Sequence, residues 1–390
     1  MTKITRNFLI ELKRRIGQRQ PFIQAVLGPR QVGKTTAVLE LESSLNAPFY
    51  YCTADSPVPP GAEWLRHSWL TARAKAGDSA GVFVVDEVQK IEGWSEQVKI
   101  LFDEERRRPV PLEVVILGSA SWRLQSGLTE SLAGRYELLS VPHWSFGECK
   151  ESFGWDLNTY LKFGGYPAPA RLIDEKSRWQ AFMQDSILEP MLSRDLLSLK
   201  AIGKPALFRQ SMQLALSYPA QELSLEKFLG QLQDKGNSTT VRGYLQLLEA
   251  GFVIKLLEKY STRPLSSKSS SPKLLPLCPA LIHSFIDPVK VDIDPAWRGR
   301  VFEAAIGSAL HRSGAKLSYW RDGKSEVDYV LEFENRLVAV EVKSNSVKNE
   351  RGLLEFKKNF PNAETILISE EFGEKLLEAD NAAKFILALL

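Results

Sequence analysis

The feature that most constrains this chain is a glycine-rich loop that directly follows a short apolar segment. Residues 22–27 read Phe-Ile-Gln-Ala-Val-Leu, the pattern of a buried strand, and residues 28–36 continue as Gly-Pro-Arg-Gln-Val-Gly-Lys-Thr-Thr. This run matches the P-loop template at every fixed position. In such a loop the glycines let backbone N–H groups face phosphates, and the helix that starts there adds the positive end of its dipole. The sequence therefore predicts a triphosphate-binding loop at the end of a strand.

The side chains of this loop suit ATP and a magnesium ion. Lys34 would place its positive charge against the β and γ phosphates, and the Thr35 hydroxyl would be a ligand of Mg²⁺. A chance loop of glycine and lysine is the alternative interpretation, and the preceding strand and following helix argue against it. The other residues expected to surround the nucleotide are Gly28, Pro29, Arg30, Gln31, Val32, Gly33 and Thr36.

A second apolar segment ends in two acids. Residues 82–87 read Val-Phe-Val-Val-Asp-Glu, which predicts a strand with Asp86 and Glu87 at its end. Asp86 would hold the Mg²⁺ through water, and Glu87 would polarise the water that attacks the terminal phosphate. Acids at a strand end also occur as simple solvated caps, but the loop upstream favours the catalytic interpretation. Two separate segments thus indicate ATP hydrolysis.

Two further polar positions are candidates for a part in hydrolysis. Residues 114–121 form another apolar strand that ends in small polar side chains, and Ser119 or Ser121 would orient the attacking water. A plain turn at the strand end is the alternative. Arg135 is a candidate arginine finger, which would neutralise charge at the γ-phosphate of a neighbouring subunit. For Arg135 the alternative is a surface salt bridge.

The order of the apolar segments predicts an α/β fold in the N-terminal part of the chain. Strand-like segments alternate there with helical ones, which implies a parallel sheet with helices on both faces. The expected strands cover residues 22–27, 49–52, 81–85 and 112–117, and the expected helices cover residues 3–16, 35–45, 64–76 and 94–107.

The hydropathy pattern changes twice further along. Residues 155–257 read mostly as helices, with three prolines as expected breaks, and an α/β pattern returns from about residue 297. A polar stretch between these regions indicates an exposed loop or linker. The expected breaks are Pro190, Pro205 and Pro219, and the expected domains cover residues 1–145, 146–265 and 280–390.

Composition limits the function only weakly. Of the 390 residues, 44% are hydrophobic and 25% charged, as in ordinary globular proteins. The net charge of +3 permits a nucleic-acid partner without requiring one. The apolar stretches have the length of strands, well short of the ~20 residues that cross a bilayer, and the three cysteines show no metal-ligand spacing. We expect a cytoplasmic protein without membrane contact.

The middle region contains a candidate winged helix. Residues 224–232 and 239–249 read as two helices, with Ser238 as the cap of the second, and residues 252–260 read as a strand. In the DNA-reading arrangement, the start of the second helix meets base edges or phosphates. Packing against the ATP-binding region or against a partner protein is the alternative. The candidate DNA-contacting residues are Asn237, Thr239, Thr240 and Arg242.

The C-terminal region carries a second chemical pattern. Glu303 lies in an expected helix over residues 297–311, and Asp328 lies in an expected strand. Glu341 and Lys343 end the next strand, where side-chain alternation places them on the same face. This order is similar to the PD-(D/E)XK nuclease core.

That similarity implies metal-dependent cleavage of a phosphodiester. Asp328 and Glu341 would bind Mg²⁺ or Mn²⁺, and Glu303 would support the metal from the helix. Lys343 would position or activate the attacking water. Ordinary strand-end charges are one alternative, and a fold kept as an interaction module without cleavage is another.

Together these motifs resemble a bacterial and archaeal family of AAA-type (AAA+) ATPases that carry a C-terminal region of unknown function. The resemblance covers nearly the whole chain and implies a P-loop sheet, a helical and winged-helix domain, and a restriction-endonuclease-like α/β domain. It also implies ATP at subunit interfaces, in a ring or hexamer. Residues 275–279 depart from the family pattern, which is usually more strand-like and aromatic there. The motifs that carry the resemblance lie at residues 28–36, 84–89, 117–121 and 131–135.

Three functional hypotheses follow. The leading one is a DNA-acting ATPase, a motor of helicase or branch-migration type, accompanied by metal-dependent nuclease activity. The second is an ATP-dependent regulatory or defence switch, in which the nuclease-like domain is an interaction module that does not cleave. The third is a nuclease gated by ATP. DNA-stimulated ATP turnover distinguishes the first from the second, and metal-dependent cutting distinguishes the third.

Overall fold

The computed structural model describes residues 6–18, 22–119, 127–196, 204–232, 237–261, 270–344 and 350–390. The chain divides into two compact units, Lys3–Pro142 and His143–Leu390. Among the residues described, no helix has both the length and the apolar character that a membrane span requires. The division into three domains stays a prediction.

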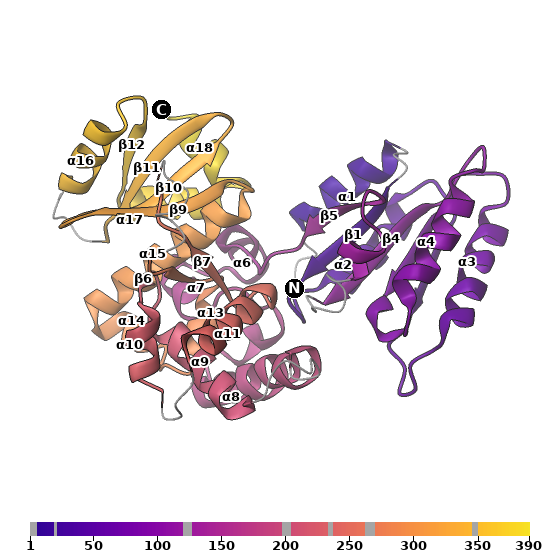
Figure 1. The fold of residues 1–390 in the computed structure, drawn as a ribbon, viewed down its shortest axis with the longest axis horizontal. Helices are drawn as coiled ribbons and strands as arrows, with labels where there is room; N and C mark the ends of the chain where they lie inside the picture. The colour runs from indigo at the N-terminus through magenta and orange to yellow at the C-terminus, as the bar shows by residue number, and fades with distance from the viewer. Residues whose placement is uncertain are drawn as a thin grey trace. The chain divides into compact units, whose positions relative to one another are not determined.

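The first unit is built on a parallel sheet (Figure 1). Its described strands are β1 (Ile23–Gly28), β2 (Phe49–Thr53), β3 (Val82–Asp86), β4 (Glu113–Ser119) and β5 (Tyr136–Ser140). They lie in the order β2-β3-β4-β1-β5, and every neighbouring pair is parallel. The four strands expected from the sequence are confirmed. The apolar pattern does not predict the edge strand β5, because Leu139 is its only buried residue.

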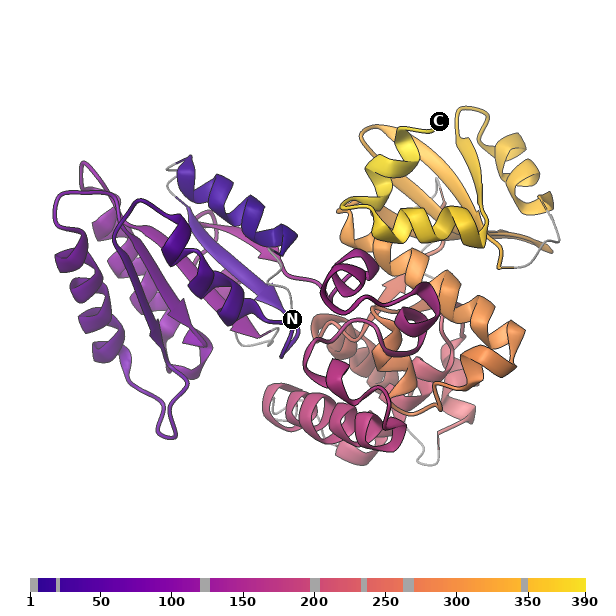
Figure 2. The same cartoon turned by 180° about the vertical axis from the view of Figure 1, so that it is seen from behind.

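Helices cover both faces of this sheet, as predicted (Figures 1 and 2). They are α1 (Asn7–Gly17), α2 (Lys34–Glu40), α3 (Ala62–Ala76) and α4 (Trp94–Glu105), with short 3₁₀ turns η1 (Glu42–Ser44) and η2 (Val88–Lys90). Phe83 of β3 packs in a buried cluster with Trp69 of α3 and Phe102 of α4. Val84 points to the opposite face, because strand side chains alternate, and it is equally buried. The apolar run of β3 is therefore that of a central strand buried on both sides.

The second unit begins with helices. Those described are α6 (Phe146–Phe153), α7 (Leu157–Phe163), α8 (Lys176–Phe182) and α9 (Pro205–Ser217), with a 3₁₀ segment η3 (Ala168–Leu172) and π-helical segments η4 (Met183–Leu188) and η5 (Met191–Leu196). The predicted break at Pro190 is wrong, since the chain stays helical from η4 through to η5. Pro190 lies between the two π-helical segments, next to backbone that departs from the regular i→i−4 pattern that a proline interrupts. Pro205 begins α9, and Pro219 follows its end.

A helix pair and a small sheet follow. The helices are α10 (Leu225–Gly230) and α11 (Ser238–Ala250), and the strands are β6 (Gln221–Glu222), β7 (Ile254–Leu257) and β8 (Lys273–Pro276). In the described residues, β8 lies between β6 and β7 and is antiparallel to both. The predicted cap of α11 is wrong by one residue, because Asn237 rather than Ser238 accepts the Thr240 N–H, at 2.7 Å. The winged-helix interpretation stays a prediction.

A mixed sheet forms the C-terminal part, with the order β12-β11-β10-β9 in the residues that the structure describes. Strands β9 to β11 are antiparallel, and β12 is parallel to β11. The register of β10 on β9 shifts between Val327 and Val330, so Asp328 lies in a bulge, which redirects side chains locally. The elements are α13 (Pro279–His283), α14 (Lys290–Ile293), α15 (Pro295–Arg312), β9 (Lys316–Asp322), β10 (Ser325–Phe333), β11 (Arg336–Val342), α16 (Arg351–Asn359), β12 (Glu364–Ile368), α17 (Glu370–Glu378) and α18 (Ala382–Leu387).

Candidate functional site

The glycine-rich loop joins the end of β1 to the start of α2. Gly33, the residue before α2, has a φ of 86°, a left-handed conformation that glycine adopts without strain. A Cβ on Gly28 would lie 2.2 Å from the carbonyl oxygen of Val141, so a larger residue does not fit there. The two glycines of the template are thus required for different reasons, backbone conformation at Gly33 and close approach at Gly28.

Lys34 is held inside this loop. The residue is only 8% exposed, and its Nζ donates to the carbonyl oxygens of Gly28 at 2.9 Å and Pro29 at 2.7 Å. The ammonium therefore lies against the loop backbone, which is the place that the P-loop prediction requires. Arg30, Gln31, Val32 and Thr36 lie in the same loop and the first turn of α2.

A buried arginine outside the motif supports the loop. Arg6 is 4% exposed, and its Nη1 donates to the carbonyl oxygen of Val32 at 2.6 Å. Its Nη2 donates to the carbonyl oxygen of Pro142 at 2.9 Å. Arg6 thereby ties the loop to the segment that follows β5. The sequence pattern contains no local signal for this role, because the partners are backbone atoms far along the chain.

Thr35 and Asp86 are in direct contact, although they are 51 positions apart. The Thr35 hydroxyl donates to Asp86 Oδ2 at 2.6 Å, and the Tyr51 hydroxyl donates to the same oxygen at 3.1 Å. A hydroxyl beside a carboxylate at a phosphate-binding loop provides the hard oxygen atoms that Mg²⁺ prefers, so these residues fit the predicted metal. Burial, and next the charge of Asp86, raises the pKa of Tyr51, so its hydroxyl remains a donor.

Tyr51 is a residue that sequence reasoning missed. The parallel register pairs Thr53 of β2 with Asp86 of β3. Because side chains two residues apart share a face of a strand, Tyr51 lies on the same face as Thr53. The strand alternation of β2 was the available signal, but its use requires knowing that β2 lies beside β3.

Glu87 and Ser119 are linked by a glutamine. Gln89 Nε2 donates to Glu87 Oε2 at 2.7 Å and to Ser119 Oγ at 3.5 Å. Glu87 itself has a φ of 53°, and its N–H donates to the carbonyl oxygen of Leu117 in β4 at 3.0 Å. The structure thus brings together the two residues predicted to act on the attacking water. Ser121, the other predicted candidate, lies outside the described residues.

The electrostatic setting of Glu87 suits a base. Burial raises the pKa of its carboxyl above the ordinary value, and the nearby charge of Asp86 adds to this rise. The positive charges of Arg30 and Lys34 act in the opposite direction. A carboxylate with a raised pKa accepts a proton more readily, which is what activation of water needs.

Arg135 lies at the opposite end of the parallel strands from the glycine-rich loop. Ile23, where β1 begins, donates its N–H to the Arg135 carbonyl at 2.8 Å, whereas the loop follows the other end of β1. The guanidinium pairs with both oxygens of Asp103 on α4, at 2.9 Å from Nε and 2.8 Å from Nη2. The salt bridge considered as the alternative is therefore present. A finger acting on another subunit stays a prediction.

The C-terminal acids also come together, around a lysine that sequence reasoning missed. Lys273 of β8 places its Nζ 2.6 Å from Glu303 Oε1 and 3.1 Å from the carbonyl oxygen of Asp328. The same Nζ lies 3.7 Å from Asp328 Oδ1. Its side chain is 7% exposed. The available signal was a lysine at the start of a short apolar strand.

The remaining predicted residues complete this cluster. Lys343 Nζ lies 2.5 Å from Glu341 Oε1, as expected for side chains on one face of β11. Asp328 Oδ2 accepts the Val342 N–H at 2.8 Å. Glu341 Oε2 is buried and has no hydrogen-bond partner in the described part of the chain. We call the five residues Lys273, Glu303, Asp328, Glu341 and Lys343 the carboxylate–lysine cluster.

Burial shifts the titration of this cluster. It raises the pKa of Glu303 and of Glu341, and the neighbouring Asp328 charge raises both further. Burial alone would lower the pKa of Lys273, but the carboxylates of Glu303 and Asp328 outweigh it and the net shift is upward. Lys273 therefore remains a cation within the cluster.

The cluster does not fit the divalent metal predicted for it. In the residues that the structure describes, no group of three His, Cys, Asp or Glu side chains could hold a metal ion. The ammonium of Lys273 lies between Glu303 and Asp328, where the metal was expected. Glu341 Oε1 is engaged by Lys343. The metal-binding roles of Glu303, Asp328 and Glu341 are therefore not supported by this arrangement.

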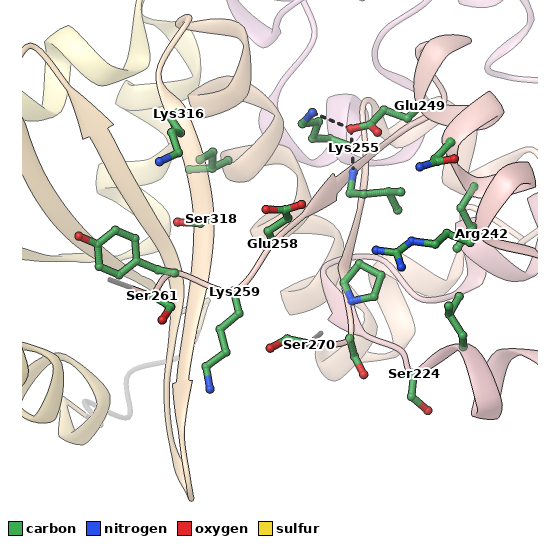
Figure 3. Close-up of a pocket in the computed structure, with 18 of the residues that line it drawn as sticks. Ser224, Arg242, Glu249, Lys255, Glu258, Lys259, Ser261, Ser270, Lys316 and Ser318 are labelled. Carbon is green, nitrogen blue, oxygen red and sulfur yellow. Dashed lines mark hydrogen bonds and ion pairs between the residues drawn. The ribbon is translucent and has the colours of Figure 1, made fainter. Parts of the chain in front are cut away.

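A cavity of about 1130 Å³ lies between α11, the segment after β7, and β9, all within the second unit (Figure 3). Lys255 and Lys316 line it but are paired with Glu249 at 2.6 Å and Glu332 at 2.7 Å. Arg242, a predicted DNA-contacting residue, reaches into it from α11, and Lys259 projects from the opposite segment (Figure 3). Neither Arg242 nor Lys259 forms an ion pair with the residues described.

The parallel sheet, the loop after β1 and the acids after β3 define a P-loop nucleotide-binding domain. In agreement, the family model described as an AAA domain matches residues 20–150. Two families described as domains of unknown function match the rest, DUF8612 at residues 154–288 and DUF4143 at residues 298–383.

Relatives extend this match over most of the chain. Uncharacterized protein Rv2008c of Mycobacterium tuberculosis is 30% identical over 344 residues, which cover 85% of this chain and 72% of that protein. The figures are the same for Uncharacterized protein Mb2031c of Mycobacterium bovis. An uncharacterized protein of Haemophilus influenzae is 20% identical over 380 residues, covering 91% and 90%. The chain belongs to the family of Rv2008c and Mb2031c and carries an AAA domain followed by two domains of unknown function.

Two solved structures that match this chain are distant from it. A variant of RuvB from Thermotoga maritima has a TM-score of 0.33 and 16% identity, covering 64% of this chain and 87% of that one. The Aeropyrum pernix Orc1 protein, in complex with DNA, has a TM-score of 0.30 and 12% identity, covering 76% and 95%. These similarities are too distant to transfer a function.

Proposed function

We propose that the chain binds ATP with Mg²⁺ at the glycine-rich loop and hydrolyses it to ADP and phosphate. The 2.6 Å contact between Thr35 and Asp86 carries the proposal, because it joins the two motifs where a phosphate-bound Mg²⁺ would be held. That ion, when bound, supplies charge that stabilises the phosphoryl group in transfer. Lys34 would neutralise the β and γ phosphates, and Glu87 would orient the attacking water.

Two substitutions separate binding from hydrolysis. Lys34→Ala should lose both nucleotide binding and turnover, since the loop would lack its buried cation. Glu87→Gln should keep binding but lower turnover by about 100-fold or more, because a positioned base is worth about 10²–10⁴ in rate. Binding is measured with a fluorescent ATP analogue, and turnover is measured as phosphate release. Lys99→Ala, on the exposed side of α4, is the matched control. Full turnover in Lys34→Ala would remove the proposal.

We further propose that this turnover acts on DNA. The support is the pair Arg242 and Lys259, two cations that reach into the cavity of the second unit without an ion-pair partner among the residues described. Backbone phosphates are suitable ligands for such charges. A helicase-like or branch-migration-like motor, working as a ring or hexamer, is the form of this proposal that the AAA domain suits best.

The DNA proposal is tested by ATP turnover with and without single-stranded, duplex and branched DNA. Stimulation should weaken in Arg242→Ala and Lys259→Ala, and its dependence on salt should become less steep. Lys255→Ala is the control, because Lys255 is already paired with Glu249. Equal stimulation in all variants would place any DNA contact elsewhere.

A regulatory or defence switch with a non-cleaving C-terminal module is the second candidate. The position of Lys273 within the carboxylate–lysine cluster favours one element of this candidate, a C-terminal module that does not cleave nucleic acid. A nucleotide-dependent change in oligomeric state, without stimulation of turnover by DNA, would support the switch over the motor. Cleavage of DNA with Mg²⁺ or Mn²⁺ that depends on Asp328, Glu341 and Lys343 would count against this candidate.

A further inference from the structure

The central observation is that Lys273 comes from a different sheet than the acids that surround it. Lys273 belongs to β8, which β6 and β7 flank on both sides. Glu303 lies on α15, and Asp328 lies in the bulge of β10. Lys273 is therefore not part of the acid–acid–lysine pattern of the C-terminal region. Its side chain reaches the acids of that pattern from a separate sheet.

Several contacts hold the ammonium in place. It donates to Glu303 Oε1 at 2.6 Å and to the carbonyl oxygen of Asp328 at 3.1 Å. It also lies 4.8 Å from the centroid of the Tyr329 ring, a cation–π distance. The Tyr329 hydroxyl in turn donates to the carbonyl oxygen of Glu303 at 2.8 Å. These partners surround the Nζ with a carboxylate, a carbonyl and an aromatic face, so the site is built for a single positive charge.

The charges of the cluster come within one unit of balance without a divalent ion. Glu303, Asp328 and Glu341 face the ammonium groups of Lys273 and Lys343, which leaves one negative charge when all are ionised. A divalent cation bound between Glu303 and Asp328 would have to displace the Lys273 ammonium and leave it buried without its partners, which is costly.

We propose that the ammonium of Lys273 is the resident cation of the carboxylate–lysine cluster and excludes divalent metal ions, so that this region does not cleave nucleic acid by a metal-dependent route. The proposal is independent of ATP hydrolysis in the first unit. It assigns the cluster a structural role, in which β8 is fastened to α15 and β10 through one buried charge.

Manganese titration of the full-length, nucleotide-free chain tests the proposal, with the paramagnetic resonance signal of unbound Mn²⁺ as the readout. Wild type and Asp328→Asn should bind equal amounts of Mn²⁺ up to millimolar concentration. Lys273→Met should gain one site per chain, because removal of the ammonium leaves Glu303 and Asp328 without their cation. The double variant Lys273→Met/Asp328→Asn should lose that site. Lys255→Met, which removes a lysine of the adjacent strand, should gain none.

Two results would overturn the proposal. One is Mn²⁺ binding, or Mn²⁺-dependent cutting of supercoiled plasmid, that wild type shows and Asp328→Asn lacks. The other is a folded Lys273→Met variant that gains no site. If Lys273→Met does not fold, the comparison of wild type with Asp328→Asn decides alone, since Asn keeps an oxygen to accept the Val342 N–H.

Discussion

Gln89 donates a hydrogen bond of 2.7 Å to Glu87 and also contacts Ser119, so one side chain holds the candidate base beside the candidate sensor. The residue is 8% exposed and follows the acids of β3 within the turn η2. Because the bond fixes the carboxylate of Glu87, the loss of Gln89 should affect hydrolysis more than ATP binding. We regard Gln89 as a positioning residue.

Gln89→Ala should lower kcat by about tenfold, a part of the 10²–10⁴ that a positioned base contributes, with little change in KM for ATP. An N–H donor favours the ionised carboxylate. Its removal should therefore raise the pKa of Glu87 further and move the acid limb of the kcat profile to higher pH. Steady-state kinetics across pH measure both effects, with the exposed Gln213→Ala as control. An unchanged acid limb with normal kcat would show that the bond has no role in hydrolysis.

Arg135 and Asp103 can be separated by substitution. If Arg135 acts only in the salt bridge, Arg135→Ala and Asp103→Asn should behave alike and leave ATP turnover unchanged. If Arg135 reaches the γ-phosphate of a neighbour, only Arg135→Ala should lose turnover. We expect the second outcome. Mixing Arg135→Ala with Lys34→Ala chains should then restore activity, because each chain supplies what the other lacks; a mixture without recovery counts against a finger between subunits.

Gly28→Ala should destabilise the first unit by about 1–3 kcal/mol, the range for overpacking a buried position. The added Cβ would lie 2.2 Å from the backbone oxygen of Val141, which cannot move aside as a flexible side chain would. Nucleotide binding should weaken as well, because the loop begins at this residue. Gly17→Ala is the matched control, since nothing lies within 4 Å of its added Cβ. Thermal unfolding and ATP-analogue binding measure the two effects, and equal behaviour of the two variants would contradict the close approach.

Glu303 should make the stability of the second unit depend on pH. Burial, then the Asp328 charge, raises the pKa of Glu303 from the ordinary 4.5 to about 8, so the folded chain binds this proton more tightly than the unfolded chain. The contribution is fully present below pH 4.5 and is lost as the pH rises towards 8. Relative to Glu303→Gln, wild type should therefore lose stability across this window, by at most about 1.4 kcal/mol per pH unit.

Urea unfolding at a series of pH values measures this difference. The control is Glu334→Gln in the exposed turn between β10 and β11, which should track wild type. Parallel curves for wild type and Glu303→Gln would mean that the carboxyl titrates normally.

Much of the candidate nucleotide site could be located from the sequence because many of its residues are contiguous. The glycine-rich loop is one run of residues, and Asp86 and Glu87, the candidate metal ligand and the candidate base, end one apolar strand. Parallel strands bring their carboxyl ends to one edge of the sheet, so the meeting of Thr35 with Asp86 follows from the fold class. The helix through Pro190 could not be predicted, since a proline normally interrupts an α-helix and the π-helical segments that flank Pro190 were not expected.

The sequence by itself determined which chemical groups are present, the strand–loop–helix that carries them, and the same-face placement of Glu341 and Lys343. Only the tertiary structure decided that Arg6 supports the loop, that Tyr51 shares the oxygen of Asp86, and that Lys273 enters the C-terminal acids. The physical reason is that local patterns depend on backbone geometry over a few residues. Strand order, register and bulges instead set which distant side chains meet, and no short stretch of sequence contains that information.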